Sequence, residues 1–436
     1  MAPLPTANAV YTKGTIFTDV QLDAITPDEL VHWFSTKVYG VPDPQEDDHP
    51  TRERSSLLEH YKKCLSFYMP NKLTPWNVMT RTGNPTRSIA VNELIKRVKK
   101  NEVQQQGKAS SARRPLEKKE FEQLITLLED SPDIIKKYMV TAAAKFQFTM
   151  IARIDDTSHF LEEDLKPNPQ FDFYLLCRVC WSKNVLEERN APDQLLLGSN
   201  NPTYCILLAL GLFLEVWLAA GQALGTPFLF GHAASAKTNK KYISDQFKAC
   251  WDDPRFVRLA AGPLGPPSNR KFPATLSRRS GCSRDDTDSR GRWRKKRVSD
   301  RYVDINLPYP DAKVASVLCI GGPVKYILKN GSGVSNLWLT QNVVPHIFAS
   351  ERIQGNVALV LALPILWACF DSTVEGKMPG QMRNRIRLEY EAIRGPTMEA
   401  TENPVKKVPL VVTGCEAEVY IDEIVNMDDD GGNHPL

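Results

Sequence analysis

The sequence predicts a multidomain, mainly α-helical protein with a small β-sheet. Helical patterns alternate with turns through 26–100, helices are predicted within 116–154, and 203–220 is predicted to be a long apolar helix. A shorter apolar run, 172–182, has the length and composition of a strand. With 436 residues, the chain is long enough for two or three domains, each with its own core.

Changes in composition predict the domain boundaries. We expect a loose, Pro- and Ala-rich N-terminus at 1–20 and a helical domain at 21–106. The periodic pattern then stops, and 107–115 is predicted to be a basic linker. An α+β domain is expected at 116–330, followed by a C-terminal extension at 331–436 with an acidic tail.

Two local signals support the helical domain. The segment Thr26-Pro27-Asp28-Glu29 is typical of a helix N-terminus. The segment SIAVNELIKRVKK at 88–100 is predicted to be a helix with one apolar face. That face is expected to carry Ile89, Val91, Leu94, Ile95 and Val98.

Composition argues against a membrane protein and a disulfide-rich protein. The two most apolar stretches, 204–220 and 357–370, are interrupted by Glu215 and Pro364, and both are shorter than the roughly 20 residues that span a bilayer. Residues 1–20 lack the charged start and apolar run of a signal peptide, so we expect none. Nine cysteines without framework spacing favour a reducing compartment.

The sequence also argues against a metal centre. Cys177 and Cys180 form a CxxC, but no second pair and no histidine lies nearby. The pair falls in a predicted strand, where an offset of three places two side chains on opposite faces. The seven histidines have no metal-binding spacing. We therefore expect neither a metal nor a cofactor.

Positive charge is concentrated in one segment, 270–302. It contains twelve Lys and Arg residues and four Asp residues, a local charge of +8 in a chain of net charge +4. The rest of the chain is therefore slightly acidic. Positive charge gathered in this way is typical of a polyanion site, and nucleic acid is the commonest polyanion partner.

The same segment carries a spaced set of reactive residues. Arg270 precedes Trp293 by 23 residues, and Trp293 precedes Tyr302 by nine. An arginine, a glycine-flanked Trp or His, and a tyrosine at these spacings resemble the second half of the tyrosine recombinase active site. Within that superfamily the chain is most similar to the Crypton group of eukaryotic mobile elements. The similar segments are GRWRKKRVSDRY, LPYPDAKV and NPTRSIAVNELIKRVKKNEVQQQGKASSARRP, and the similarity runs from about residue 70 to 430.

The resemblance implies a fold and an active site. It implies a helical DNA core-binding domain at 21–106 and a tyrosine recombinase catalytic domain at 116–330. It also implies that Arg153 and Arg270 bind the phosphate, that Lys183 is the proton donor and that Tyr302 is the nucleophile. Trp293 would pack near the phosphate, and Asp156, three residues after Arg153, would orient its guanidinium. The family carries His or Lys three residues before the second arginine, where this chain has Pro267.

These residue types suit phosphodiester cleavage. A tyrosine, with an ordinary pKa near ~10, attacks phosphorus well only if nearby cations favour the phenolate. Two guanidinium groups can hold both non-bridging oxygens and stabilise the extra charge of the transition state. Flanking basic residues are expected to contact DNA: Lys271, Arg278, Arg279, Arg292, Arg294, Lys295, Lys296 and Arg297, with Arg113 and Arg114 of the linker.

Three functions remain open. The first is a strand-transferring recombinase that mobilises or integrates a DNA element through a 3′-phosphotyrosyl intermediate. The second is a catalytically decayed DNA-binding protein on the same fold, since Pro267 offers no titratable group. The third is a topoisomerase of type IB. The first predicts double-stranded DNA and self-association into a tetramer as partners, and the basic run 294–297 favours the nucleus.

Overall fold

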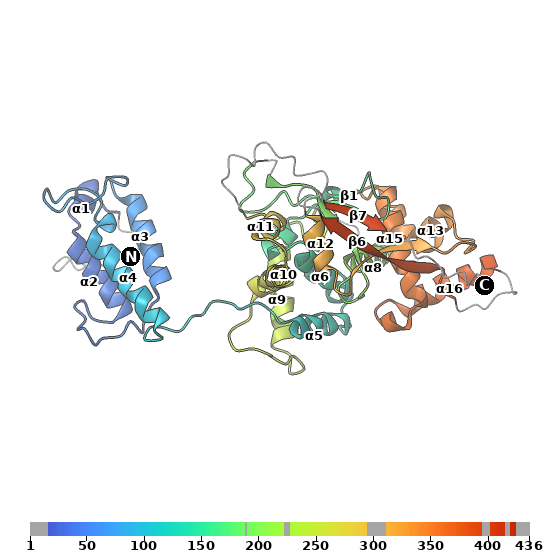
Figure 1. Ribbon diagram of the computed structural model, residues 1–436, viewed down its shortest axis with the longest axis horizontal. Coiled ribbons are helices and arrows are strands. Elements are labelled where there is room, and N and C mark those ends of the chain that lie inside the picture. Colours follow the sequence, from blue (N-terminus) through green and yellow to red (C-terminus); the bar gives the residue numbers. More distant parts are fainter. Residues whose placement is uncertain are drawn as a thin grey trace, which may run out of the picture. The chain divides into compact units, whose positions relative to one another are not determined.

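The computed structural model is mainly helical, with two small antiparallel sheets among its described residues (Figure 1). This confirms the expected mainly-α class with a small amount of strand. The described residues are 16–187, 190–221, 227–293, 311–394, 402–414 and 419–423. The chain divides after Ala112 into two compact units, and this point lies within 107–115.

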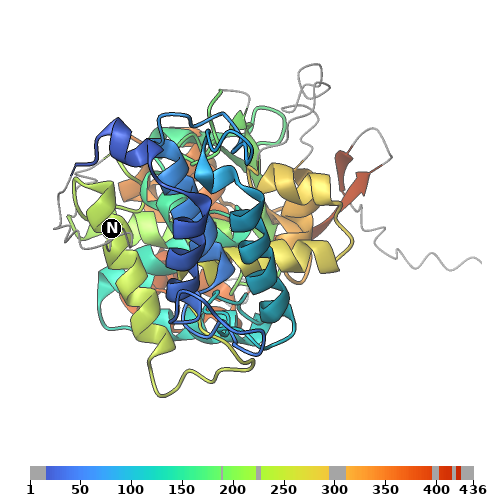
Figure 2. The same ribbon diagram turned by 90° about the vertical axis from the view of Figure 1, so that its left-hand side faces the viewer.

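The N-terminal unit is a small helical bundle. It contains α1 (Asp19–Asp23), α2 (Pro27–Val38), α3 (Ser55–Tyr68), a 3-10 turn at Pro85–Arg87 and α4 (Ile89–Val103). Helices α2 and α4 run side by side (Figure 2). Thr26 and Glu29 form a capping box at the start of α2, which confirms the helix signal predicted there.

The apolar face of α4 is narrower than expected. Val91, Leu94, Ile95 and Val98 are buried, whereas Ile89 is 75% exposed. The prediction for Ile89 is wrong because it precedes Val91 by two residues, which places it about 200° away around a helix of 3.6 residues per turn.

The C-terminal unit is larger and is built around a large apolar core, with a second, smaller apolar cluster that includes Tyr174, Leu195 and Ala312. Its first helices are α5 (Lys118–Glu129), a π-helical turn (Ile135–Val140), α6 (Thr141–Thr149), α7 (Ile154–Ser158), α8 (Ile206–Ala219) and α9 (Ala236–Trp251). Next come α10 (Pro266–Arg279), α11 (Arg284–Arg290) and α12 (Ala312–Leu318). The segment beyond residue 330 adds α13 (Asn336–Asn342), α14 (Pro345–Phe348), α15 (Gly355–Phe370) and α16 (Gly380–Arg394) to the same unit.

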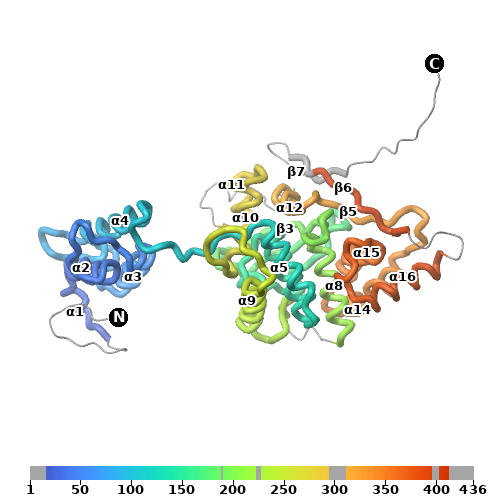
Figure 3. The backbone as a smooth tube through the Cα atoms, turned by 90° about the horizontal axis from the view of Figure 1, so that it is seen from below, coloured from blue at the N-terminus to red at the C-terminus, as the bar shows by residue number. Residues whose placement is uncertain are grey.

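The two most apolar segments form buried helices, as expected. Helices α8 and α15 lie side by side in the centre of the unit (Figure 3). Glu215 lies buried within the continuous helix α8, and its carboxylate caps α14, accepting the backbone N–H of Ile347 at 3.1 Å and contacting His346 Nδ1 at 2.6 Å. Within the described residues, no helix is long and apolar enough to cross a membrane.

The sheets are short. One has the order β1 (Leu165–Pro167), β2 (Leu175–Cys177), β3 (Gln194–Leu196), with both pairs antiparallel and Leu176 opposite Lys166 and Leu195. The other has the order β4 (Gly198–Ser199), β5 (Pro323–Leu328), β6 (Val405–Gly414), β7 (Val419–Glu423).

The strand predicted at 172–182 is correct in type but shorter than expected, because only β2 pairs with neighbours there. Cys177 is buried in β2, whereas Cys180 lies beyond the end of that strand and is exposed, so the two thiols of the CxxC do not share one strand, contrary to the prediction. The described residues contain no cluster of metal-ligating side chains.

Candidate functional site

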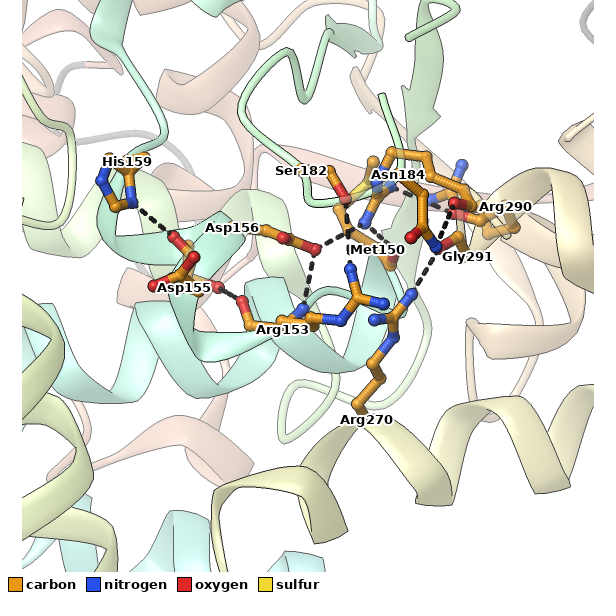
Figure 4. Close-up of polar contacts among 12 residues, drawn as sticks. Met150, Arg153, Asp155, Asp156, His159, Ser182, Asn184, Arg270, Arg290 and Gly291 are labelled. Carbon is orange, nitrogen blue, oxygen red and sulfur yellow. Dashed lines mark hydrogen bonds and ion pairs between the residues drawn. The ribbon is translucent and has the colours of Figure 1, made fainter. Parts of the chain in front are cut away.

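Three arginines from distant parts of the chain come together in the C-terminal unit. Arg153 is the N-cap of α7, Arg270 lies in α10, and Arg292 follows α11. Figure 4 shows the guanidinium groups of Arg153 and Arg270 pointing toward each other. The site therefore joins two residues that the sequence predicted to bind one phosphate.

The backbone at this cluster is strained at two points. Ile151 has φ of 47° and Arg292 has φ of 54°. Residues other than glycine rarely adopt a positive φ, and a β-branched residue such as isoleucine is a clear outlier there. Ile151 makes the turn from α6 into α7 that positions Arg153. Strain held at such points is a common property of functional sites.

Asp156 holds Arg153 by its backbone. The Oδ2 atom accepts the Arg153 backbone N–H at 3.0 Å and lies 3.5 Å from Nη2 of Arg292. We expected Asp156 to orient the guanidinium of Arg153, and this is wrong in the described structure. The carboxylate sits beneath the start of α7, where it caps the helix and neutralises Arg292 instead.

The guanidinium of Arg153 is half-buried and donates to Ser182 Oγ at 3.4 Å. Ser182 lies in the loop between β2 and β3, and the next residue is Lys183, whose side chain is exposed. The structure therefore places the predicted proton donor in the loop that contacts Arg153. The side chain of Lys183 is free to approach a ligand from solvent.

Arg270 is held from two sides. Its Nη2 donates to the Gly291 carbonyl, and its Cζ lies 4.7 Å from the centre of the Trp293 ring. A side chain at position 291 would come within 2.5 Å of that ring, so only glycine fits there. The Nε of Arg270 is buried without a hydrogen-bond partner. Trp293 thus packs on Arg270, the arginine that precedes it by 23 residues in the predicted site.

The electrostatic environment of Arg270 favours an added anion. Burial, together with the charges of Arg153 and Arg292, lowers the pKa of Arg270 to about 9. In this cluster the three guanidinium groups face one carboxylate, that of Asp156. An anion placed between Arg153 and Arg270 would relieve the repulsion between their charges.

Arg292 does not contact solvent. We expected it to bind DNA, but its side chain is 1% exposed and its Nη1 donates to Gln194 Oε1 at 2.7 Å. Its Nη2 reaches the Met150 carbonyl at 3.3 Å. That prediction is wrong, because the arginine ties the end of α6 to β3 beneath the site.

Arg290 supports the site and was not predicted. It is fully buried, pairs with Asp311, and donates to the carbonyls of Thr149 at 3.1 Å and Leu195 at 2.9 Å. Its partners are far apart in the sequence, so nothing in the basic run marks it as a core residue.

The other basic residues fall into three groups. Arg113, Lys271, Arg278 and Arg279 are exposed and accessible to a polyanion. Arg114 forms an ion pair with Glu120 and donates to both of its carboxylate oxygens at 2.6 Å each. A phosphate could bind Arg114 only by displacing this buried carboxylate. Arg294, Lys295, Lys296, Arg297 and Tyr302 lie outside the described residues.

Pro267 is exposed in the first turn of α10, three residues before Arg270. Proline has no N–H and fits this turn without loss of a hydrogen bond.

Neither a family model nor a curated protein sequence matches the chain. The arginine cluster is therefore the feature from which a function can be inferred.

Proposed function

We propose that the protein is a DNA-binding tyrosine recombinase, which cleaves and rejoins DNA strands through a 3′-phosphotyrosyl intermediate and so mobilises or integrates a DNA element. The observation that carries the proposal is the convergence of Arg153 and Arg270 on one position, with a buried N–H of Arg270 left unsatisfied. A phosphodiester fits this position because guanidinium groups bind its two non-bridging oxygens in a planar fork.

The charge of the cluster also fits the reaction. Three guanidinium groups and the Asp156 carboxylate leave two positive charges in a largely buried site. A phosphodiester carries one negative charge, and the pentacoordinate state formed by attack on phosphorus carries two. Fixed cations in a low-dielectric site stabilise the second state more than the first, which is the requirement for catalysis.

The remaining chemistry belongs to Tyr302 and Lys183. The phenolate of Tyr302 would attack phosphorus and form a bond to the 3′-phosphate, while the bond to the 5′-oxygen breaks. Lys183 would give that oxygen its proton. A 5′-hydroxyl from another strand then reverses the step, so the joining needs neither a metal nor ATP. Joining of exchanged strands would require self-association, and work on chromosomal DNA would place the protein in the nucleus.

Pro267 supports the second candidate, a DNA-binding protein that has lost catalysis. A histidine three residues before Arg270 would face the same side of α10, and proline there supplies no proton. Loss of one general acid–base group typically slows a reaction by ~10²–10⁴-fold. Both candidates require the arginine cluster to bind a DNA phosphate.

Binding of double-stranded DNA at several salt concentrations tests this shared requirement. We expect Arg153→Ala and Arg270→Ala each to weaken binding and to lower the salt slope by about 1. Arg258→Ala is the matched control, because this exposed arginine of the same unit lies outside the cluster. Equal affinity in all four proteins would overturn the proposal. Relaxation of supercoiled plasmid by the purified protein would favour the topoisomerase alternative.

A further inference from the structure

All eight tryptophans of the chain are described, and Trp181 is the exposed one, with 59% of its surface accessible. The others are buried or half-buried. An indole exposed to water lacks the favourable free energy that burial of its large apolar surface would give. Among the described residues, then, Trp181 is a ring available for contact with another molecule.

The ring is held in place rather than free. It stacks on the imidazole of His159 with centroids 4.4 Å apart and an angle of 12° between the planes. His159 Nδ1 lies 2.8 Å from the Asp155 carbonyl, and Phe228 meets the imidazole edge-on at 6.0 Å. One face of Trp181 is thus covered by a buttressed ring. Preorganisation of this kind reduces the entropy that a ligand must offset on binding.

The stacked pair lies beside the arginine cluster. Trp181 is the residue before Ser182, whose hydroxyl accepts from Arg153, and consecutive Cα atoms are about 3.8 Å apart. His159 follows Arg153 by six residues through α7, or about 9 Å at the rise of a helix. The pair therefore lies within one or two nucleotides of a phosphate held by Arg153.

We propose that Trp181 is a stacking platform for a nucleobase that has left the duplex next to the bound phosphate. This inference rests on the proposed DNA-binding function and adds a specificity-determining residue to it. Every base has a flat π-face, so stacking accepts any base and selects unpaired over paired DNA. A ring anchored on one side and exposed on the other has the form that such selection needs.

The experiment compares two short duplexes of one sequence, fully paired or with a single unpaired thymine. Fluorescence anisotropy with the full-length protein measures both affinities. We expect the wild type to prefer the unpaired thymine by about 5- to 150-fold, the range of a base–aromatic stack. Trp181→Ala should remove the preference without changing affinity for the paired duplex, and Trp181→Phe should keep most of it.

Two further comparisons separate the causes. Phe348→Ala removes another exposed aromatic ring of the same unit, 50% exposed on α14, and should leave the preference intact. Arg153→Ala should weaken binding of both duplexes alike, which tests the proposed function separately. If Trp181→Ala does not fold, Trp181→Leu replaces it, since leucine keeps apolar bulk without a π-face.

A second signal is direct. With 2-aminopurine in place of the thymine, binding of the wild type should quench its fluorescence, and Trp181→Ala should not. An absence of preference in the wild type, or a preference that persists in Trp181→Ala or Trp181→Leu, would overturn the inference. Equal weakening of both duplexes by Trp181→Ala would also overturn it.

Discussion

Trp293 lies against Arg270, with the ring centre 4.7 Å from the guanidinium carbon. The indole covers a buried cation and leaves its Nε without a partner. Cation–π contacts of desolvated groups contribute about 2 kcal/mol. The pair thus holds a buried arginine at a position where two other guanidinium groups oppose its charge.

Trp293→Ala should therefore loosen Arg270 and weaken DNA binding by up to about 30-fold, the equivalent of 2 kcal/mol. Trp293→Phe should lose less, because a smaller ring keeps part of the contact. Binding titrations with one duplex measure both effects, and circular dichroism checks the fold. A folded Trp293→Ala with wild-type affinity would show that the indole does not position Arg270.

Asp156→Asn should destabilise the C-terminal unit. The amide can still accept the Arg153 backbone N–H, but it leaves the buried charge of Arg292 without its partner. Removal of one partner from a buried pair costs about 3–5 kcal/mol. The neighbouring Asp155→Asn is the control, since its pair with Lys240 is more than 40% exposed on both sides and contributes about 0–1 kcal/mol. Urea unfolding midpoints should fall for the first variant only, and equal midpoints would contradict the role assigned to Asp156.

Glu215→Gln should release the start of α14. The buried carboxylate accepts from the Ile347 backbone N–H and contacts the His346 ring, and hydrogen bonds to charged groups contribute about 1.5–3 kcal/mol each. His346→Ala keeps the backbone cap and should lower the free energy of unfolding by about 0–1 kcal/mol, because the imidazole is half-exposed. A larger loss for His346→Ala than for Glu215→Gln in urea unfolding would show that the ion pair, not the cap, stabilises α14.

Glu162 should make stability depend on pH. Burial raises its pKa from 4.5 to about 7, although Arg352 lies 2.9 Å away and opposes the shift. The folded state then binds more protons than the unfolded state between these values, so the contribution of Glu162 to stability falls as pH rises from 4.5 to 7. Glu162→Gln removes this dependence.

Melting temperatures at pH 5 and pH 8 measure the effect of Glu162. We expect Glu162→Gln to be more stable relative to wild type at the higher pH than at the lower. The adjacent, exposed Glu163→Gln is the control and should show no such change. A difference between wild type and Glu162→Gln that is the same at both pH values would contradict the prediction.

Periodicity and capping chemistry predicted the local elements well. The capping box at Thr26 and the buried stripe of α4 depend on residues within one or two turns of each other. The short strands could not be delimited, because β2 ends where its pairing with β1 and β3 ends. Pairing across the chain leaves no local pattern.

The residues of the candidate site likewise divide into those that the sequence marks and those that it does not. The resemblance to the recombinase motif selected Arg153, Arg270 and Trp293, and the structure brings them together. Arg290 and Arg292 could not be separated from their exposed neighbours in the basic run. Their burial depends on partners such as Asp311 and Gln194 that lie far away in the sequence.

The proposed function requires the arginine cluster to prepare a DNA phosphate for attack by Tyr302. Purified protein is mixed with nicked duplexes from the DNA flanking its gene, and covalent adducts are detected after denaturation. We predict an adduct with the wild type, a larger yield with Pro267→His and none with Tyr302→Phe. DNA binding without an adduct in both the wild type and Pro267→His, or an adduct that persists in Tyr302→Phe, would contradict the claim.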